Sequence, residues 1–166
     1  RAIRIRCFIH KWHNIEKSLG AESHKALGLF WALRDAKDLT EAKVVSDRLE
    51  SVLRDLNLSA LASYLEAKED LLVIHELKLS KDLKTFFSTT NPIESLNYLI
   101  EEDMRRVKRW KDSKHFQRWC ATFCLAAEKR MRRIRGYRSL PGLWILLRKL
   151  TEQNDVDTNQ EINDVA

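Results

Sequence analysis

The sequence predicts a mainly α-helical protein, on three observations. Apolar residues recur at helical spacing along most of its 166 residues. Residues that start or stop helices flank these patterns, as Thr40 and Gly136 do. No pattern between residues 20 and 88 requires a strand. A chain of this length can bury a substantial hydrophobic core.

One strand is expected, at the N-terminus, where residues 2–9 are apolar-rich and partly alternate with polar ones. A helix is expected to follow from about His10 to Leu19, and Gly20 then interrupts the pattern. Further helical patterns precede a break near Ser88, and they cover residues 27–36, 42–56 and 58–74.

The run TTNPIES, residues 89–95, predicts the start of an amphipathic helix. Asn91 can cap it, Pro92 suits its first position and Glu94 falls at the third. The Glu94 carboxylate can reach back to the Asn91 amide, and its charge suits the positive end of the helix dipole. Glu94 is therefore either a cap or a catalytic carboxylate, and the local pattern favours the cap.

The chain becomes densely basic beyond this helix start, at Arg105, Arg106, Lys108, Arg109 and Lys111. A second helix, expected from about Ser113, leads into another basic run over residues 129–135. Trp110, Trp119 and Tyr137 lie beside these clusters. Each phosphate that Lys or Arg neutralises releases a counterion, so a nucleic acid is a suitable partner. A solvated cationic face explains the same runs equally well.

The composition favours a cytoplasmic protein that faces DNA and binds no membrane. Its formal net charge is +6. No apolar run approaches the roughly 20 residues of a membrane span, and no signal-peptide pattern opens the sequence. Cys7, Cys120 and Cys124 have no disulfide spacing, which favours a reducing compartment.

Several short runs resemble, in order and approximate spacing, the C-terminal part of Mutator-type bacterial insertion-sequence transposases. They are TTNPIESLN (89–97), VKRWKD (107–112), QRW (117–119), AAEKRMRRIRGY (126–137) and LPGL (140–143). The opening RCFIHKWHNI also resembles this family, and its Cys7 and His10 resemble the CxxH element. Residues 20–85 share only helical character with it.

The resemblance implies a DDE recombinase with an RNase H-like catalytic fold. In that family three carboxylates bind two divalent ions, Mg²⁺ or Mn²⁺, for phosphodiester cleavage and strand transfer. Glu94 matches the third acid by its TTNPIES context, which implies a catalytic residue and metal ligand. The implied partners are DNA, at transposon ends and target sites, and further copies of the complete enzyme. The residues implied to meet phosphates or a partner subunit are Arg105, Arg106, Lys108, Arg109 and Lys111.

The resemblance also divides the chain into four segments. Residues 1–19 would hold the last core strand and the helix with the CxxH element, and residues 20–88 an all-helical insertion. Residues 89–150 would be catalytic-core helices that carry Glu94, and residues 151–166 an acidic tail expected to be disordered. Cys7 and His10 are expected to have a structural role, because no second ligand pair completes a zinc site.

The family's first two catalytic aspartates lie upstream of the CxxH element, and none of the six residues before Cys7 is acidic. We therefore expect a C-terminal fragment that is inactive alone and holds no metal pair stably, because one carboxylate is too few. The complete enzyme is expected in the bacterial cytoplasm, at the nucleoid when bound to DNA. The alternative is a helical DNA-binding or protein-interaction module in which Glu94 only caps a helix.

Overall fold

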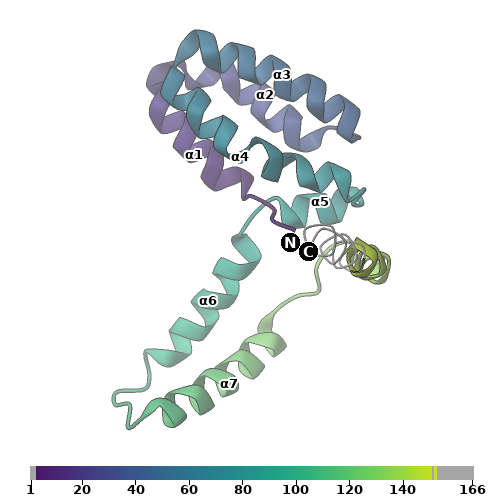
Figure 1. Ribbon diagram of the computed structural model, residues 1–166. Coiled ribbons are helices and arrows are strands. Elements are labelled where there is room, and N and C mark those ends of the chain that lie inside the picture. The colour runs from purple at the N-terminus through teal and green to yellow at the C-terminus, as the bar shows by residue number, and fades with distance from the viewer. Residues whose placement is uncertain (1–2, 151, 153–166) are drawn as a thin grey trace, which may run out of the picture. The chain divides into compact units, whose positions relative to one another are not determined.

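The structure, a computed structural model, describes residues 3–150 and 152. Residues 140–150 form a helix in addition to those labelled in Figure 1. The prediction of a mainly helical protein is confirmed. The labelled elements, with two short 3₁₀ turns η1 and η2, are α1 (Phe8–Leu19), η1 (Gly20–Ser23), α2 (His24–Asp35), α3 (Leu39–Leu56), α4 (Leu58–Glu76), α5 (Lys81–Phe87), α6 (Asn91–Met104), α7 (Ser113–Arg130) and η2 (Tyr137–Ser139).

The strand expected over residues 2–9 is not found. Residues 3–7 are irregular, and Phe8 already begins α1. A strand is stable only beside another strand that pairs with its backbone groups, and residues 3–150 and 152 contain none. The irregular segment instead lies along α4, where the backbone N–H of Arg6 donates to the backbone carbonyl of Asp70 over 3.4 Å.

The described residues form two compact units, residues 3–89 with 135–150 and 152, and residues 90–134. In the first unit α3 packs against both α2 and α4, and α1 packs against α4 (Figure 1). The predicted segments 1–19 and 20–88 therefore share one core.

Of the predicted acidic tail, only Glu152 lies among the described residues, where it pairs with Arg148 at 2.9 Å.

Apolar side chains from α1 to α4 fill this core. The Phe30 ring lies 5.7 Å from that of Phe8 and 5.2 Å from that of Trp12, measured between centroids. Full burial of one such side chain contributes about 1.5–3 kcal/mol, so the inward face of each helix is strongly specified. Within the core, Ser46 and Tyr64 satisfy each other through a 2.7 Å hydrogen bond between their hydroxyls.

Side-chain caps determine where the helices begin. Asp38, not Thr40, caps α3, because its extended backbone lets the carboxylate accept from the Glu41 N–H at 2.9 Å. Asn57 caps α4 in the same way. Gly136 does not end α7, which stops at Arg130; it precedes η2 with a φ of 77°. That left-handed conformation favours glycine.

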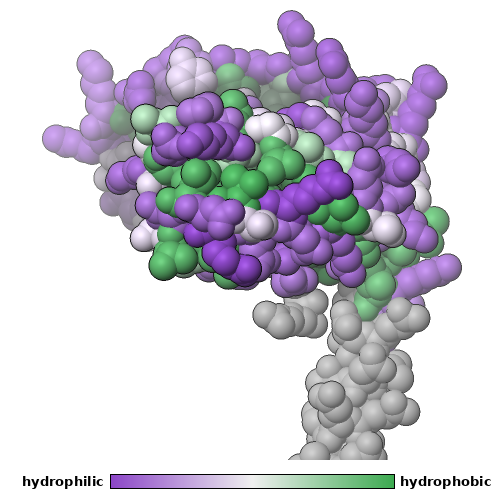
Figure 2. Space-filling model, turned by 90° about the horizontal axis from the view of Figure 1, so that it is seen from above, coloured by the Kyte–Doolittle hydropathy of each residue, from purple (hydrophilic) through white to green (hydrophobic). Residues whose placement is uncertain are grey.

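The face of the first unit that is seen from above is mostly hydrophilic (Figure 2). Figure 2 shows one face, on which polar and charged side chains surround an apolar area. Helices α2 and α3, uppermost in Figure 1, carry the exposed apolar residues Leu27 and Val44. Among residues 3–150 and 152, no helix combines the length and apolar character needed to cross a membrane.

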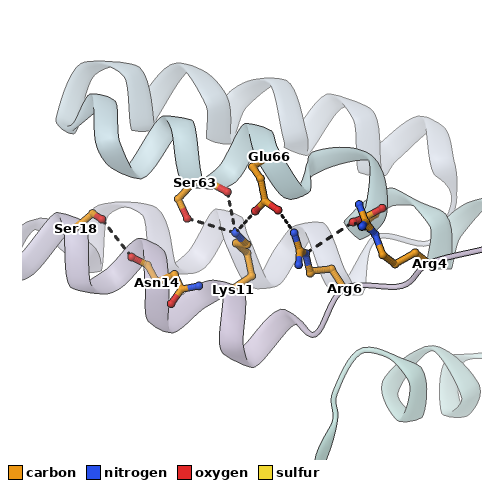
Figure 3. A network of polar contacts seen from close by, with 8 residues as sticks. Arg4, Arg6, Lys11, Asn14, Ser18, Ser63 and Glu66 are labelled. Carbon is orange, nitrogen blue, oxygen red and sulfur yellow. Dashed lines mark hydrogen bonds and ion pairs between the residues drawn. The ribbon is translucent and has the colours of Figure 1, made fainter.

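A polar network joins the N-terminal segment to α4 (Figure 3). The buried Lys11 ammonium donates to the Ser63 carbonyl at 3.0 Å and to Glu66 Oε2 at 2.7 Å. Arg6 donates to the other oxygen of Glu66 and lies 3.8 Å from Asp70. The Lys11 hydrogen bond and the two positive charges lower the pKa of the Glu66 carboxyl. Lys11, within the RCFIHKWHNI run, thus has a structural role.

We expect Lys11→Ala to lower the free energy of unfolding by about 1–3 kcal/mol, because the Ser63 carbonyl loses its charged partner and α1 loses a packed aliphatic stem. Lys17→Ala on the same helix, at an exposed position, should change it by less than about 0.5 kcal/mol. Urea titration followed by circular dichroism measures both. Equal stabilities of the two variants would contradict this assignment.

The buried His75 should make the free energy of unfolding depend on pH. Its ring is buried, and burial together with the nearby Lys84 charge lowers its pKa from the usual 6.5. Below pH 6.5 the unfolded chain therefore takes up a proton that the folded chain resists. The free energy of unfolding should fall as the pH drops from 7.5 to 5.5, by up to about 1.4 kcal/mol per pH unit.

Denaturant titrations across this pH range measure the slope for the wild type and for His75→Gln. The variant should be less stable at pH 7.5 but should lack most of the slope, because glutamine does not titrate. An unchanged slope in the variant would assign the pH dependence to other groups.

Candidate functional site

Glu94 lies on the first turn of α6, one residue further into the helix than the sequence predicted. Thr90 occupies the N-cap position, and Pro92 and Glu94 are the second and fourth helical residues. The Thr90 carbonyl accepts from the backbone N–H groups of Ile93 and Glu94, each at 2.9 Å. This tight turn starts the helix at Asn91, one residue before the predicted first position at Pro92. Glu94 Oε1 accepts a 2.6 Å hydrogen bond from the Thr90 hydroxyl.

An open pocket of about 430 Å³ contains this carboxylate. Helices α6 and α7 lie side by side (Figure 1). The lining residues of the pocket are Glu94, Ser95, Tyr98 and Leu99 from α6, and Arg130, Met131 and Arg132 at the end of α7. The exposed acid therefore faces a space with basic residues on the opposite side.

The two arginines of this pocket differ in their pairing. Arg130 contacts Glu102 at 2.7 Å and Asp103 at 3.7 Å, and so joins α7 to α6. The hydrogen bond with Glu102 raises the pKa of Arg130 and lowers that of Glu102. Arg132 forms no ion pair with any residue of the described chain. Arg130 is thus a structural tie, whereas Arg132 carries an unneutralised charge beside the Glu94 pocket.

The described residues do not form a complete metal site around Glu94. In residues 3–150 and 152, no three His, Cys, Asp or Glu side chains lie close enough together to hold a metal ion. Glu94 can supply one carboxylate ligand, and two divalent ions in a phosphoryl-transfer site need more. Any such site therefore depends on carboxylates from elsewhere.

The five basic residues predicted to meet DNA lie at the end of α6 and in the connection to α7. Arg105 and Arg106 form long ion pairs, with Glu101 at 3.9 Å and Asp103 at 3.7 Å. The other three are exposed, and no carboxylate in the described part of the chain pairs with them: Lys108, Arg109 and Lys111. We call residues 105–111 the basic loop.

Aromatic contacts attach the basic loop to α7. The Trp110 ring lies 5.1 Å from that of Phe116, edge to face. One turn further along, Trp119 Nε1 donates to His115 Nε2 at 2.8 Å and its ring stacks on Phe123 at 5.2 Å. Trp110 remains 37% exposed, so its ring is accessible among the cations.

Cys7 and His10 lie at the start of α1. Cys7 is half-buried at the N-cap and forms no disulfide within the described part of the chain, and His10 is exposed on the first turn. The next residue, Phe8, donates its N–H to the Ser88 carbonyl at 2.8 Å, which ties the start of α1 to the end of α5. The structural role of Cys7 and His10 stays a prediction.

Sequence reasoning missed a second polar group, on the first unit. Lys84 Nζ donates to the Ala36 carbonyl at 2.6 Å and lies 3.3 Å from His75 Nδ1. These residues come from separate helices and from the α2–α3 connection, with no shared motif. Only folding brings them together, so no pattern in the sequence could indicate the group.

No protein-family model matches the chain, and comparison with curated proteins and with solved structures finds no significant match.

Proposed function

We propose that this chain is the C-terminal part of a Mutator-type DNA transposase, with Glu94 as one of three catalytic carboxylates. The observation that carries the proposal is the setting of Glu94. It is an exposed acid within the TTNPIES run, oriented by Thr90 and facing a pocket that also contains the unpaired Arg132. An RNase H-like core in the complete enzyme belongs to the same proposal.

The residues of this chain have distinct parts in such a reaction. Bound Mg²⁺ or Mn²⁺ ions would activate the attacking oxygen and stabilise the leaving oxygen. Thr90 holds the Glu94 carboxylate in one orientation through its 2.6 Å hydrogen bond. Arg132 attracts phosphate to the same pocket, and the basic loop binds the DNA backbone without regard to sequence.

The proposal places further requirements on the complete enzyme. Two metal ions need ligands on both sides of the reacting phosphate, so two more carboxylates must come from elsewhere. Residues 3–150 and 152 hold no group of carboxylates that could bind a metal ion. Without carboxylates from elsewhere, the protein would bind DNA and leave it uncut. The partners of the enzyme are DNA and further copies of itself, in the bacterial cytoplasm.

One observation favours the second candidate, a helical DNA-binding or protein-interaction module. The contact between Thr90 Oγ1 and Glu94 Oε1 is a local interaction at a helix start, and it needs no metal to explain it. In this alternative the basic loop keeps its role, and Glu94 only stabilises the first turn of α6.

Glu94→Gln tests the catalytic role in an enzyme that contains the other two carboxylates. The amide keeps the hydrogen bond from Thr90 but loses the charge that binds metal, so cleavage of transposon-end DNA should fall by at least about 10³-fold while DNA binding persists. The matched control is Glu101→Gln on the same helix, at an exposed position. Normal transposition by Glu94→Gln would leave only the capping role.

The salt dependence of DNA binding tests the basic loop. Each phosphate contact contributes about 0.9 to the slope of log K against log salt concentration. Replacing Lys108, Arg109 and Lys111 with alanine should therefore reduce the slope for duplex DNA by up to about 3, as measured by fluorescence anisotropy between 50 and 200 mM salt. The same three-residue change at Lys17, Lys43 and Arg48, which are also exposed and basic, should change it little. Equal effects of the two variants on the slope would mean that the basic loop does not contact DNA.

A further inference from the structure

A pocket of about 500 Å³ lies on the first unit, between the end of α2 and α5. Its volume is in the range of small-molecule sites, about 300–1,000 Å³. Four of its lining side chains are basic and one is acidic. The lining residues are Arg34, Asp35, Ala36, Lys37, Leu79, Lys81, Lys84 and Thr85. We call it the basic pocket.

Its one carboxylate is already engaged. Asp35 accepts two hydrogen bonds from Arg34, at 2.7 and 2.9 Å, and this pairing lowers the pKa of the Asp35 carboxyl. Arg34 and Asp35 therefore neutralise each other. Three ammonium groups remain, and in the described part of the chain none lies within ion-pair distance of a carboxylate: Lys37, Lys81 and Lys84.

Lys84 is the most constrained of the three. It is half-buried, and its ammonium contacts only neutral acceptors, the Ala36 carbonyl at 2.6 Å and His75 Nδ1 at 3.3 Å. Burial lowers the pKa of Lys84, although Asp35, Asp38 and Glu41 favour its charge from a greater distance. A cation partly removed from water is stabilised by a nearby anion, and the pocket offers the space for one.

The carboxylates next to the pocket act on its lysines only from a distance, because hydrogen bonds hold them elsewhere. Asp38 caps α3 through the Glu41 N–H, and Glu41 accepts from the Lys37 N–H at 2.8 Å. A bound ligand can supply the missing charge without breaking these contacts.

We propose that the basic pocket binds a phosphate group through Lys37, Lys81 and Lys84. Lys37 and Lys81 can each offer three N–H donors, and Lys84 has one left beside its contacts with Ala36 and His75, which together suit the several oxygens and the charge of a phosphate. The group can come from a DNA backbone or from a small phosphate compound. The first source rests on the proposed function, and the second does not.

The full chain is tested with two probes, inorganic pyrophosphate by isothermal titration calorimetry and duplex DNA by fluorescence anisotropy. The test variant is Lys37→Ala with Lys81→Ala, at two exposed positions where truncation leaves the core intact. Lys17→Ala with Lys43→Ala is the charge-matched control, also exposed. Thermal unfolding of all three proteins verifies that the fold is kept. A Lys84→Met variant removes the third charge and keeps the aliphatic stem.

The test variant should weaken pyrophosphate binding at least about tenfold, and the control should not. A parallel reduction in the DNA salt slope, by about 1 per lysine, assigns the pocket to backbone phosphates. An unchanged DNA slope with weakened pyrophosphate binding assigns it to a small phosphate compound. If the test variant weakens the binding of neither pyrophosphate nor DNA more than the control does, the proposal of a phosphate site is wrong. The variant with alanine at Lys108, Arg109 and Lys111 tests DNA binding by the basic loop, independently of the basic pocket.

Discussion

The first unit depends on the placement of one buried charge, the Lys11 ammonium between α1 and α4. A lysine this far from water needs acceptors at fixed positions, which here are the Ser63 carbonyl and the Glu66 carboxylate. Apolar packing alone tolerates small shifts of one helix along another, whereas these directed contacts do not. The network therefore sets the register of α1 on α4, around which the aromatic core of Phe8, Trp12 and Phe30 is built.

Some cations of this protein join two helices through ion pairs, and others have no carboxylate partner within the described part of the chain. Lys68 contacts Glu50 at 3.0 Å and Asp47 at 3.3 Å, and so joins α4 to α3. Arg130 joins α7 to α6 in the same manner. Arg132 beside the Glu94 pocket has no ion pair within the described part of the chain, and groups of such cations lie in the basic loop and in the basic pocket. Positive charge without an internal partner is available to an external anion, so these three places carry our functional proposals.

The Glu94 setting shows why a helix cap and a metal ligand are compatible in one residue. The Thr90 hydroxyl engages Oε1 of the carboxylate and limits its rotation. A carboxylate has about four lone-pair sites, so further acceptor capacity remains for a metal ion. Local capping therefore gives orientation, which a catalytic ligand also needs. The distinction between the two functions lies in what else approaches the pocket.

Local pattern was sufficient for most of the longer helices and for the amphipathic start at residues 89–95, because hydrophobic periodicity and capping act within a few residues. It missed the short helix α5 and misplaced the cap of α3 and the end of α7. The same reasoning was wrong about residues 2–9, since an alternating pattern becomes a strand only when another strand pairs with it. Tertiary packing alone decided the burial of Lys11 and His75 and the meeting of Lys37, Lys81 and Lys84 at one pocket. Those relations depend on how separate helices pack, and the amino-acid order carries no local signal for that.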